Sequence, residues 1–153
     1  MSRISKEIEK ILNAQIKNEM NSYILYRAMS NCLEYSGWEG ASKLWKKYAD
    51  EENGHAEKII DYMQERDCKP QIPLTVQPPK DFEGIKSIVD KSDKHEIKIT
   101  GDWKEIAKAA IKESDFLTFE LAQDFLKEQR EEEAKMIYWI DRISVLESTG
   151  ASL

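Results

Sequence analysis

The chain has 153 residues, of which 34% are charged and 41% are hydrophobic, and its formal net charge is −6. This length suits a single domain with a buried core. No segment approaches the roughly 18 consecutive apolar residues of a transmembrane helix, and no apolar signal segment follows the first methionine. The longest basic run is Lys46-Lys47. We therefore expect neither a membrane protein, nor an exported protein, nor a nucleic-acid-binding protein.

The residues that carry most enzyme chemistry are scarce in this sequence. The two cysteines, Cys32 and Cys68, are too few for a disulfide framework and lack the CxxC spacing, so we expect free thiols in a cytoplasmic protein. His55 and His95 are the only histidines. The glycine-rich motifs GxGxxG and GxxxxGK[ST] are absent, which excludes the common nucleotide-binding loops.

The prolines divide the chain into two halves, because all four lie between residues 70 and 79. On both sides of this segment, apolar residues recur every three or four positions, as they do on one face of a helix. The pattern predicts long helices over about residues 5–35, 40–66, 83–112 and 116–146, and an extended linker over about residues 67–82.

The lengths of the connections predict the topology. The loops near residues 36–40 and 113–115 are short, so each half should form an antiparallel helical hairpin. A 30-residue helix is about 45 Å long, and the linker can reach roughly 50 Å. We expect an all-α fold, a four-helix bundle with one long crossover between the second and third helices, as a single domain over residues 1–153.

Each predicted helix carries a glutamate on its apolar face, and these are Glu19, Glu52, Glu96 and Glu132. Isolated buried carboxylates are costly, and no Lys or Arg occupies the matching inward positions. Two divalent metal ions would balance the four negative charges while His55 stays neutral. The sequence therefore predicts a dinuclear metal site, and a neutral polar network is the alternative.

The spacing of these residues is close to that of di-iron bundles, in which two helices supply one Glu each and two supply Glu-x-x-His. Residues Glu52 to His55 form one such motif, whereas residues 129–132 read Gln-x-x-Glu. The stretches around these motifs, Ala49–Ala56 and Phe125–Glu133, together with Asn18-Glu19 and the proline-rich linker, resemble the non-haem ferritins of bacteria over roughly residues 4–147.

The resemblance also indicates what the chain lacks. Bacterioferritins place a haem-ligating Met directly after the bridging Glu, and Asn53 stands at that position here, so we expect no haem. Rubrerythrins add CxxC modules, which are absent. Ferritins usually carry a short C-terminal fifth helix, and the residues from 147 to 153, which include a glycine, are too few to supply it.

The resemblance implies a ligand set for two iron ions. Glu19, Glu52 and His55 would hold the first ion. Glu52, Glu96 and Glu132 would hold the second, so that Glu52 bridges the pair.

Five further residues have implied roles near these ions. Gln129 would lie beside the second iron, and Tyr26 would form a hydrogen bond near the pair, although a buried core tyrosine is the plainer interpretation. Glu51, Glu128 and Glu131 match an accessory third iron position of the family, and a solvated acidic face is the alternative.

The function implied by the resemblance is that of a ferroxidase and iron-storage subunit. Fe(II) would be oxidised by oxygen or hydrogen peroxide and stored as a ferric mineral inside a homo-oligomer, which we expect to be a 24-subunit cage. Two other classes stay open at this point: a dinuclear-iron oxidase or peroxidase that stores no mineral, and a non-catalytic bundle that serves as a scaffold.

Overall fold

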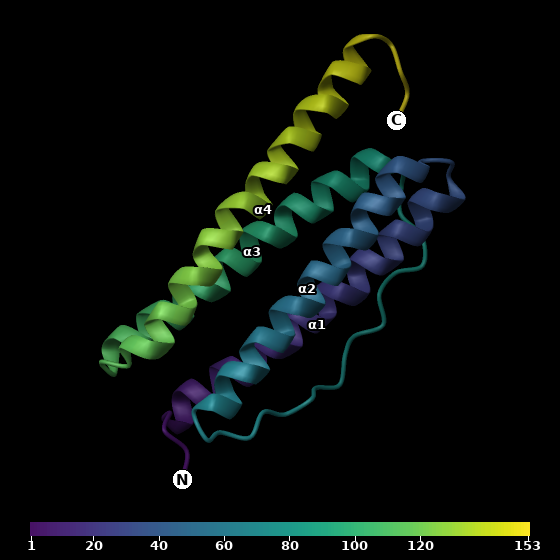
Figure 1. Cartoon of the computed structure of the whole chain (residues 1–153). Coiled ribbons are helices and arrows are strands. Elements are labelled where there is room, and N and C mark those ends of the chain that lie inside the picture. Colours follow the sequence, from purple (N-terminus) through teal and green to yellow (C-terminus); the bar gives the residue numbers. More distant parts are fainter. The chain divides into compact units, whose positions relative to one another are not determined.

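The computed structural model describes residues 1–153, and it is all-α (Figure 1). The four helices are α1 (Lys6–Tyr35), α2 (Glu39–Glu65), α3 (Ile85–Lys112) and α4 (Phe116–Ser148). Their ends differ from those expected from the sequence by at most two residues. No helix follows α4, in agreement with the expected absence of a fifth helix. No helix is long and apolar enough to cross a membrane.

Local signals in the sequence determine where α1 begins and ends. Ser5 caps the first turn, because its hydroxyl oxygen accepts a hydrogen bond from the Ile8 amide at 3.1 Å. At the other end Gly37 has a φ of +83°, a conformation that glycine adopts without strain. The Trp38 amide then donates to the Leu33 carbonyl at 2.9 Å, which terminates the helix and turns the chain into α2.

A pair of serines joins α1 to α2 within the first hairpin. The Ser30 hydroxyl donates to the Ser42 carbonyl at 2.8 Å, and the Ser42 hydroxyl donates to the Ser30 carbonyl at 2.9 Å. Both side chains are buried. This reciprocal pairing satisfies two buried hydroxyls and fixes the register of the two helices, so it also fixes which residues of α1 face those of α2.

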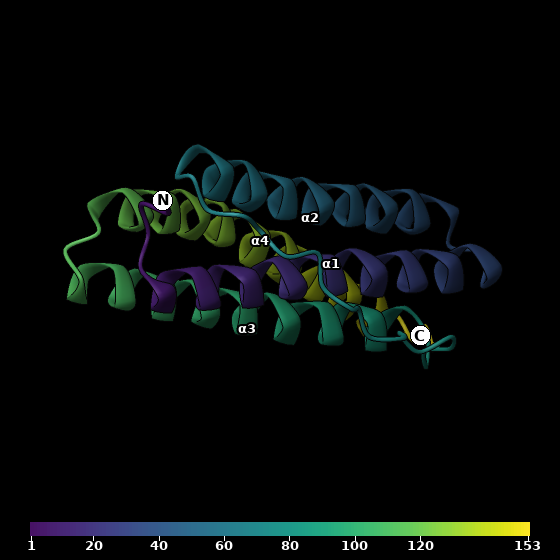
Figure 2. The ribbon, with the colours of Figure 1, turned by 90° about the horizontal axis from the view of Figure 1, so that it is seen from below.

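The proline-rich linker runs along the first hairpin, from the end of α2 towards the opposite end of the hairpin (Figures 1 and 2). Two asparagines of α1 hold its backbone. The Asn13 side-chain oxygen accepts a hydrogen bond from the Gln71 amide at 2.8 Å, and that of Asn21 accepts one from the Val76 amide at 2.9 Å. The linker is therefore attached to α1 at two points that lie eight residues apart on the helix.

The second hairpin, α3 with α4, is joined by aromatic stacking and by a salt bridge. Trp103 is fully buried, and its ring stacks on Phe125 with 3.9 Å between the ring centroids. Near the other end of the hairpin, the Lys86 ammonium donates to both carboxylate oxygens of Glu147, at 2.8 and 2.9 Å.

Trp103 should make a large contribution to stability. We expect Trp103→Ala to lower the free energy of unfolding by about 3–5 kcal/mol, because it leaves a large cavity beside Phe125. Phe116 is 68% exposed, so Phe116→Ala is the matched control and should change stability by less than about 0.5 kcal/mol. Scanning calorimetry of the metal-free proteins measures both variants, and equal melting temperatures for the two would contradict this account of the core.

Candidate metal centre

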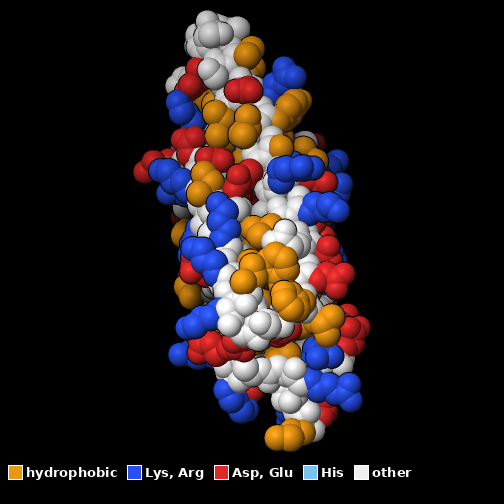
Figure 3. Space-filling view, turned by 90° about the vertical axis from the view of Figure 1, so that its left-hand side faces the viewer, with side chains coloured by type: hydrophobic (Ala, Val, Ile, Leu, Met, Phe, Trp, Pro, Cys, Tyr) orange, Lys and Arg blue, Asp and Glu red, His pale blue; other side chains and the backbone are white.

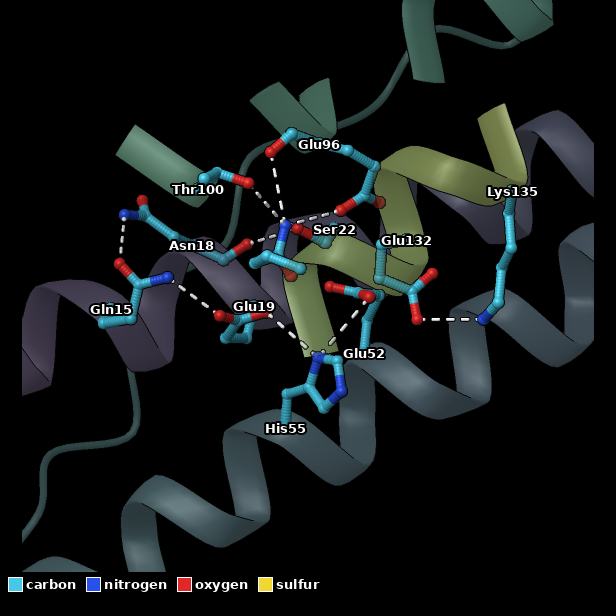
Figure 4. A network of polar contacts seen from close by, with 11 residues as sticks. Gln15, Asn18, Glu19, Ser22, Glu52, His55, Glu96, Thr100, Glu132 and Lys135 are labelled. Atoms are coloured by element: carbon cyan, nitrogen blue, oxygen red, sulfur yellow. Dashed lines mark hydrogen bonds and ion pairs between the residues drawn. The ribbon is translucent and has the colours of Figure 1, made fainter. Parts of the chain in front are cut away.

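Glu19, Glu52 and His55 come together in the first hairpin, one from α1 and two from α2 (Figure 4). Glu52 and His55 are three residues apart, so they lie on the same face of α2. The His55 Nδ1 atom is 3.5 Å from a Glu52 oxygen and 3.7 Å from a Glu19 oxygen. One potential ligand atom from each of the three residues lies within 4.8 Å of the other two, which is the geometry of a metal-binding group.

This cluster is deeply buried, with exposed fractions of 0% for Glu19, 1% for Glu52 and 6% for His55. Burial disfavours the charged imidazolium, but the contacts with the two carboxylates outweigh it and raise the pKa of His55 to about 11. Burial likewise opposes ionisation of Glu19. The contacts with His55, Glu52 and Gln15 outweigh the burial, so the pKa of Glu19 lies below its usual value. The two carboxylates therefore stabilise a positive charge between them, which in the metal-free cluster is the proton on His55.

A glutamine that was not expected from the sequence orients Glu19. Gln15 lies one turn earlier on α1 and is 2% exposed. Its side-chain nitrogen donates to a Glu19 oxygen at 2.8 Å, and its oxygen accepts from the Asn18 side chain at 3.2 Å. The signal in the sequence is the spacing of four residues, which places Gln15 and Glu19 side by side on the helix.

Glu96, Gln129 and Glu132 lie in the second hairpin, and all three are buried. The Gln129 side-chain nitrogen donates to a Glu96 carboxylate oxygen at 3.0 Å and lies 3.2 Å from the Glu96 carbonyl. The Gln129 side-chain oxygen is buried and has no hydrogen-bond partner. Carboxylate and amide oxygens are hard ligands, so each of these side chains offers an atom that a cation such as iron can bind.

Glu132 is paired with a lysine that lies outside the inward positions of α4. The Lys135 ammonium donates to a Glu132 oxygen at 2.9 Å (Figure 4). Lys135 does not occupy an inward position, because its side chain is 32% exposed. Its long aliphatic stem carries the charge from the flank of α4 to the buried carboxylate.

The remaining predicted residues are placed as follows. Tyr26 is buried on α1, seven residues after Glu19 and therefore on the same face. Glu51 is half-buried, with Lys47 at 3.9 Å. Glu128 is half-buried and Glu131 is exposed, both on α4.

The high pKa of His55 leads to a testable pH dependence. At pH 7 the imidazole of the metal-free cluster is protonated, and a metal ligand must be neutral, so Zn(II) should displace about one proton from it. Affinity should fall by roughly tenfold for each pH unit below 7, because proton competition then increases. Calorimetry in buffers of different ionisation enthalpy counts the proton, and binding without proton release would contradict the role of His55.

Comparisons with known proteins are consistent with this chemistry. A family model described as "Ferritin-like domain" matches residues 9–145. The bacterial non-heme ferritin of Campylobacter jejuni is 32% identical over 150 residues, which are 98% of this chain and 90% of that protein. A bacterial non-heme ferritin of Escherichia coli is 33% identical over 146 residues, 95% of this chain and 88% of its own length.

Among solved structures, an open pore ferritin from the hyperthermophilic archaeon Archaeoglobus fulgidus is similar at a TM-score of 0.92 and 28% identity. The match covers 95% of this chain and 89% of that one. It confirms the fold class expected from the sequence, a ferritin-like four-helix bundle with one long connection between α2 and α3.

Proposed function

Because the chain belongs to the ferritin family, we propose that it is an iron-storage subunit that oxidises Fe(II) to Fe(III) at an intrasubunit dinuclear centre. The observation that carries the proposal is the buried group of Glu19, Glu52 and His55, whose potential ligand atoms lie within 4.8 Å of one another. Such a group is expensive to bury without a cation, and iron is the cation that ferritins store.

The proposed ligand set divides between two iron ions. Glu19, Glu52 and His55 hold the first ion. Glu96 and Glu132 hold the second, and Glu52 bridges the two. The four carboxylates then balance two divalent ions, with His55 neutral and Lys135 displaced from Glu132.

The proposed oxidants are oxygen and hydrogen peroxide, and a centre with two iron ions suits both. Oxygen accepts two electrons and two protons to give hydrogen peroxide, and hydrogen peroxide accepts two of each to give two water molecules. Each Fe(II) supplies one electron, so a pair of ions reduces either oxidant in one encounter. Hard carboxylate ligands favour the Fe(III) product, and the small number of protein ligands leaves positions for the oxidant.

Further residues act around the pair in this proposal. Gln129 lies beside the second iron, and the Tyr26 hydroxyl forms a hydrogen bond near the centre. Glu51, Glu128 and Glu131 form a third iron position. Their partial or full exposure suits a position through which iron passes on its way to the mineral.

We also propose that the subunits assemble into a cytoplasmic 24-subunit cage, which encloses the ferric mineral. The support is family membership together with hydrophobic side chains left on the surface, among them Ile137, Tyr138 and Val145 of α4, which are 54–57% exposed. Figure 3 shows hydrophobic side chains gathered between charged ones on one face of the molecule. The similar archaeal structure is described as an open pore ferritin, and we propose wide or open fourfold positions for this cage as well.

The test is to add Fe(II) anaerobically, admit air, and record near-ultraviolet absorbance and particle size. We expect rapid oxidation and soluble iron-loaded particles of cage size. Oxygen consumption without retained iron would favour an oxidase that stores no mineral. A stable monomer at micromolar concentration would overturn the proposed cage.

A further inference from the structure

Thr100 and Glu133 form a hydrogen-bonded pair beside Gln129, and neither residue has a role in the function proposed above. Thr100 lies one turn after Glu96 on α3, and Glu133 lies on α4. The Thr100 hydroxyl donates to a Glu133 carboxylate oxygen at 2.7 Å. The same hydroxyl oxygen lies 3.3 Å from the Gln129 side-chain nitrogen.

The order of donors and acceptors in this chain of contacts is fixed by chemistry. An ionised carboxylate only accepts hydrogen bonds, so Glu133 takes the single hydrogen of the Thr100 hydroxyl. Towards Gln129, the Thr100 oxygen can then only accept. The atom that it accepts from must be the amide nitrogen, because the amide oxygen has no hydrogen to donate.

The amide group of Gln129 is thereby held in one of its two orientations. Its nitrogen faces three acceptors, which are the Thr100 hydroxyl, the Glu96 carboxylate and the Glu96 carbonyl. Its oxygen is directed away from them, and it is buried without a hydrogen-bond partner. A flipped amide would set its oxygen against these acceptors and turn its nitrogen, which cannot bind a cation, to the other side.

We propose that Thr100 and Glu133 are positioning residues that hold the Gln129 side-chain oxygen ready to bind the second metal ion or a water molecule on it. The inference rests on the proposed dinuclear centre. It assigns a function to Glu133, which would otherwise belong to the solvated acidic face of α4.

Substitutions at Thr100 separate the hydroxyl from the shape of the side chain. Thr100→Val keeps the shape and removes the hydroxyl, and we expect it to weaken Zn(II) at the second position by about 10-fold or more. Thr100→Ser keeps the hydroxyl and should stay within about threefold of the parent chain. Glu133→Ala, at a half-buried position, should reproduce the Thr100→Val effect even if the valine variant folds poorly.

Calorimetric Zn(II) titration, with anomalous scattering to assign the sites, measures both positions in each protein. The first position should be unchanged in all three variants, which a general loss of structure would not allow. Unchanged second-position affinity in Thr100→Val and Glu133→Ala would overturn the positioning role while the dinuclear centre stands. A parent chain that binds only one Zn(II) would overturn the dinuclear centre, and this inference with it.

Discussion

Glu52→Ala should slow the rapid phase of Fe(II) oxidation by more than about 100-fold. In the proposed centre Glu52 is the bridging ligand, so this one substitution removes a ligand from both ions. Changes outside the ligand shell typically cost 10- to 100-fold in metal affinity or activity, and the loss of a shared ligand should exceed them. Stopped-flow absorbance after mixing anaerobic Fe(II) protein with oxygenated buffer gives the rate.

The matched control for this substitution is Glu57→Ala. Glu57 is also a glutamate of α2, but it is exposed. This control should oxidise iron at the parental rate, and its assembly should be unchanged. A parental rate in Glu52→Ala would show that the oxidation site lies elsewhere.

The second large effect is the order in which the two positions fill. The position of His55 should bind Zn(II) or Fe(II) more than about 100-fold more tightly than the position of Glu96 and Glu132. Imidazole is a stronger ligand than carboxylate for borderline divalent metals, and the neutral amide of Gln129 adds no charge. In addition, Lys135 competes with the metal ion for Glu132.

Anomalous scattering from crystals that contain about half an equivalent of Zn(II) per chain measures this order. We expect density at the His55 position alone, and His55→Ala should abolish the early filling. Equal occupancy of the two positions, or earlier filling at Glu96 and Glu132, would contradict the ligand assignment. A weaker second position would let iron leave the proposed centre for the mineral.

The helices could be predicted because their signals are local. The three-to-four-residue period, the Ser5 cap, the turn at Gly37 and the confinement of the prolines to residues 70–79 each act over a few residues. The period also identified the four buried glutamates, because a polar residue on an apolar stripe stands out. The same period places Leu117 and Leu146 on the apolar stripe of the fourth helix, but near the ends of α4 these side chains are 48% and 42% exposed.

The contacts that surround the glutamates could not be predicted from the pattern. Gln15 and Thr100 each lie four residues from a buried glutamate, but many polar pairs on helices share this spacing without touching. The reach of Lys135 depends on the rotamer of a long side chain, and the pairing of Thr100 with Glu133 depends on the register of two helices 33 residues apart in sequence. Such contacts depend on how the side chains pack, and the spacing of apolar residues along the chain gives no information about that packing.

In the proposed dinuclear centre, Glu52 is shared between one iron ion held by Glu19 and His55 and another held by Glu96 and Glu132. Anomalous diffraction at the iron edge tests this proposal most directly. Crystals soaked anaerobically in Fe(II) should show two iron peaks per chain, about 3.5–4 Å apart. The Glu52 carboxylate should lie between them, with His55 on one ion and Glu96 and Glu132 on the other. A single iron at His55, or two irons too far apart to share Glu52, would contradict the account.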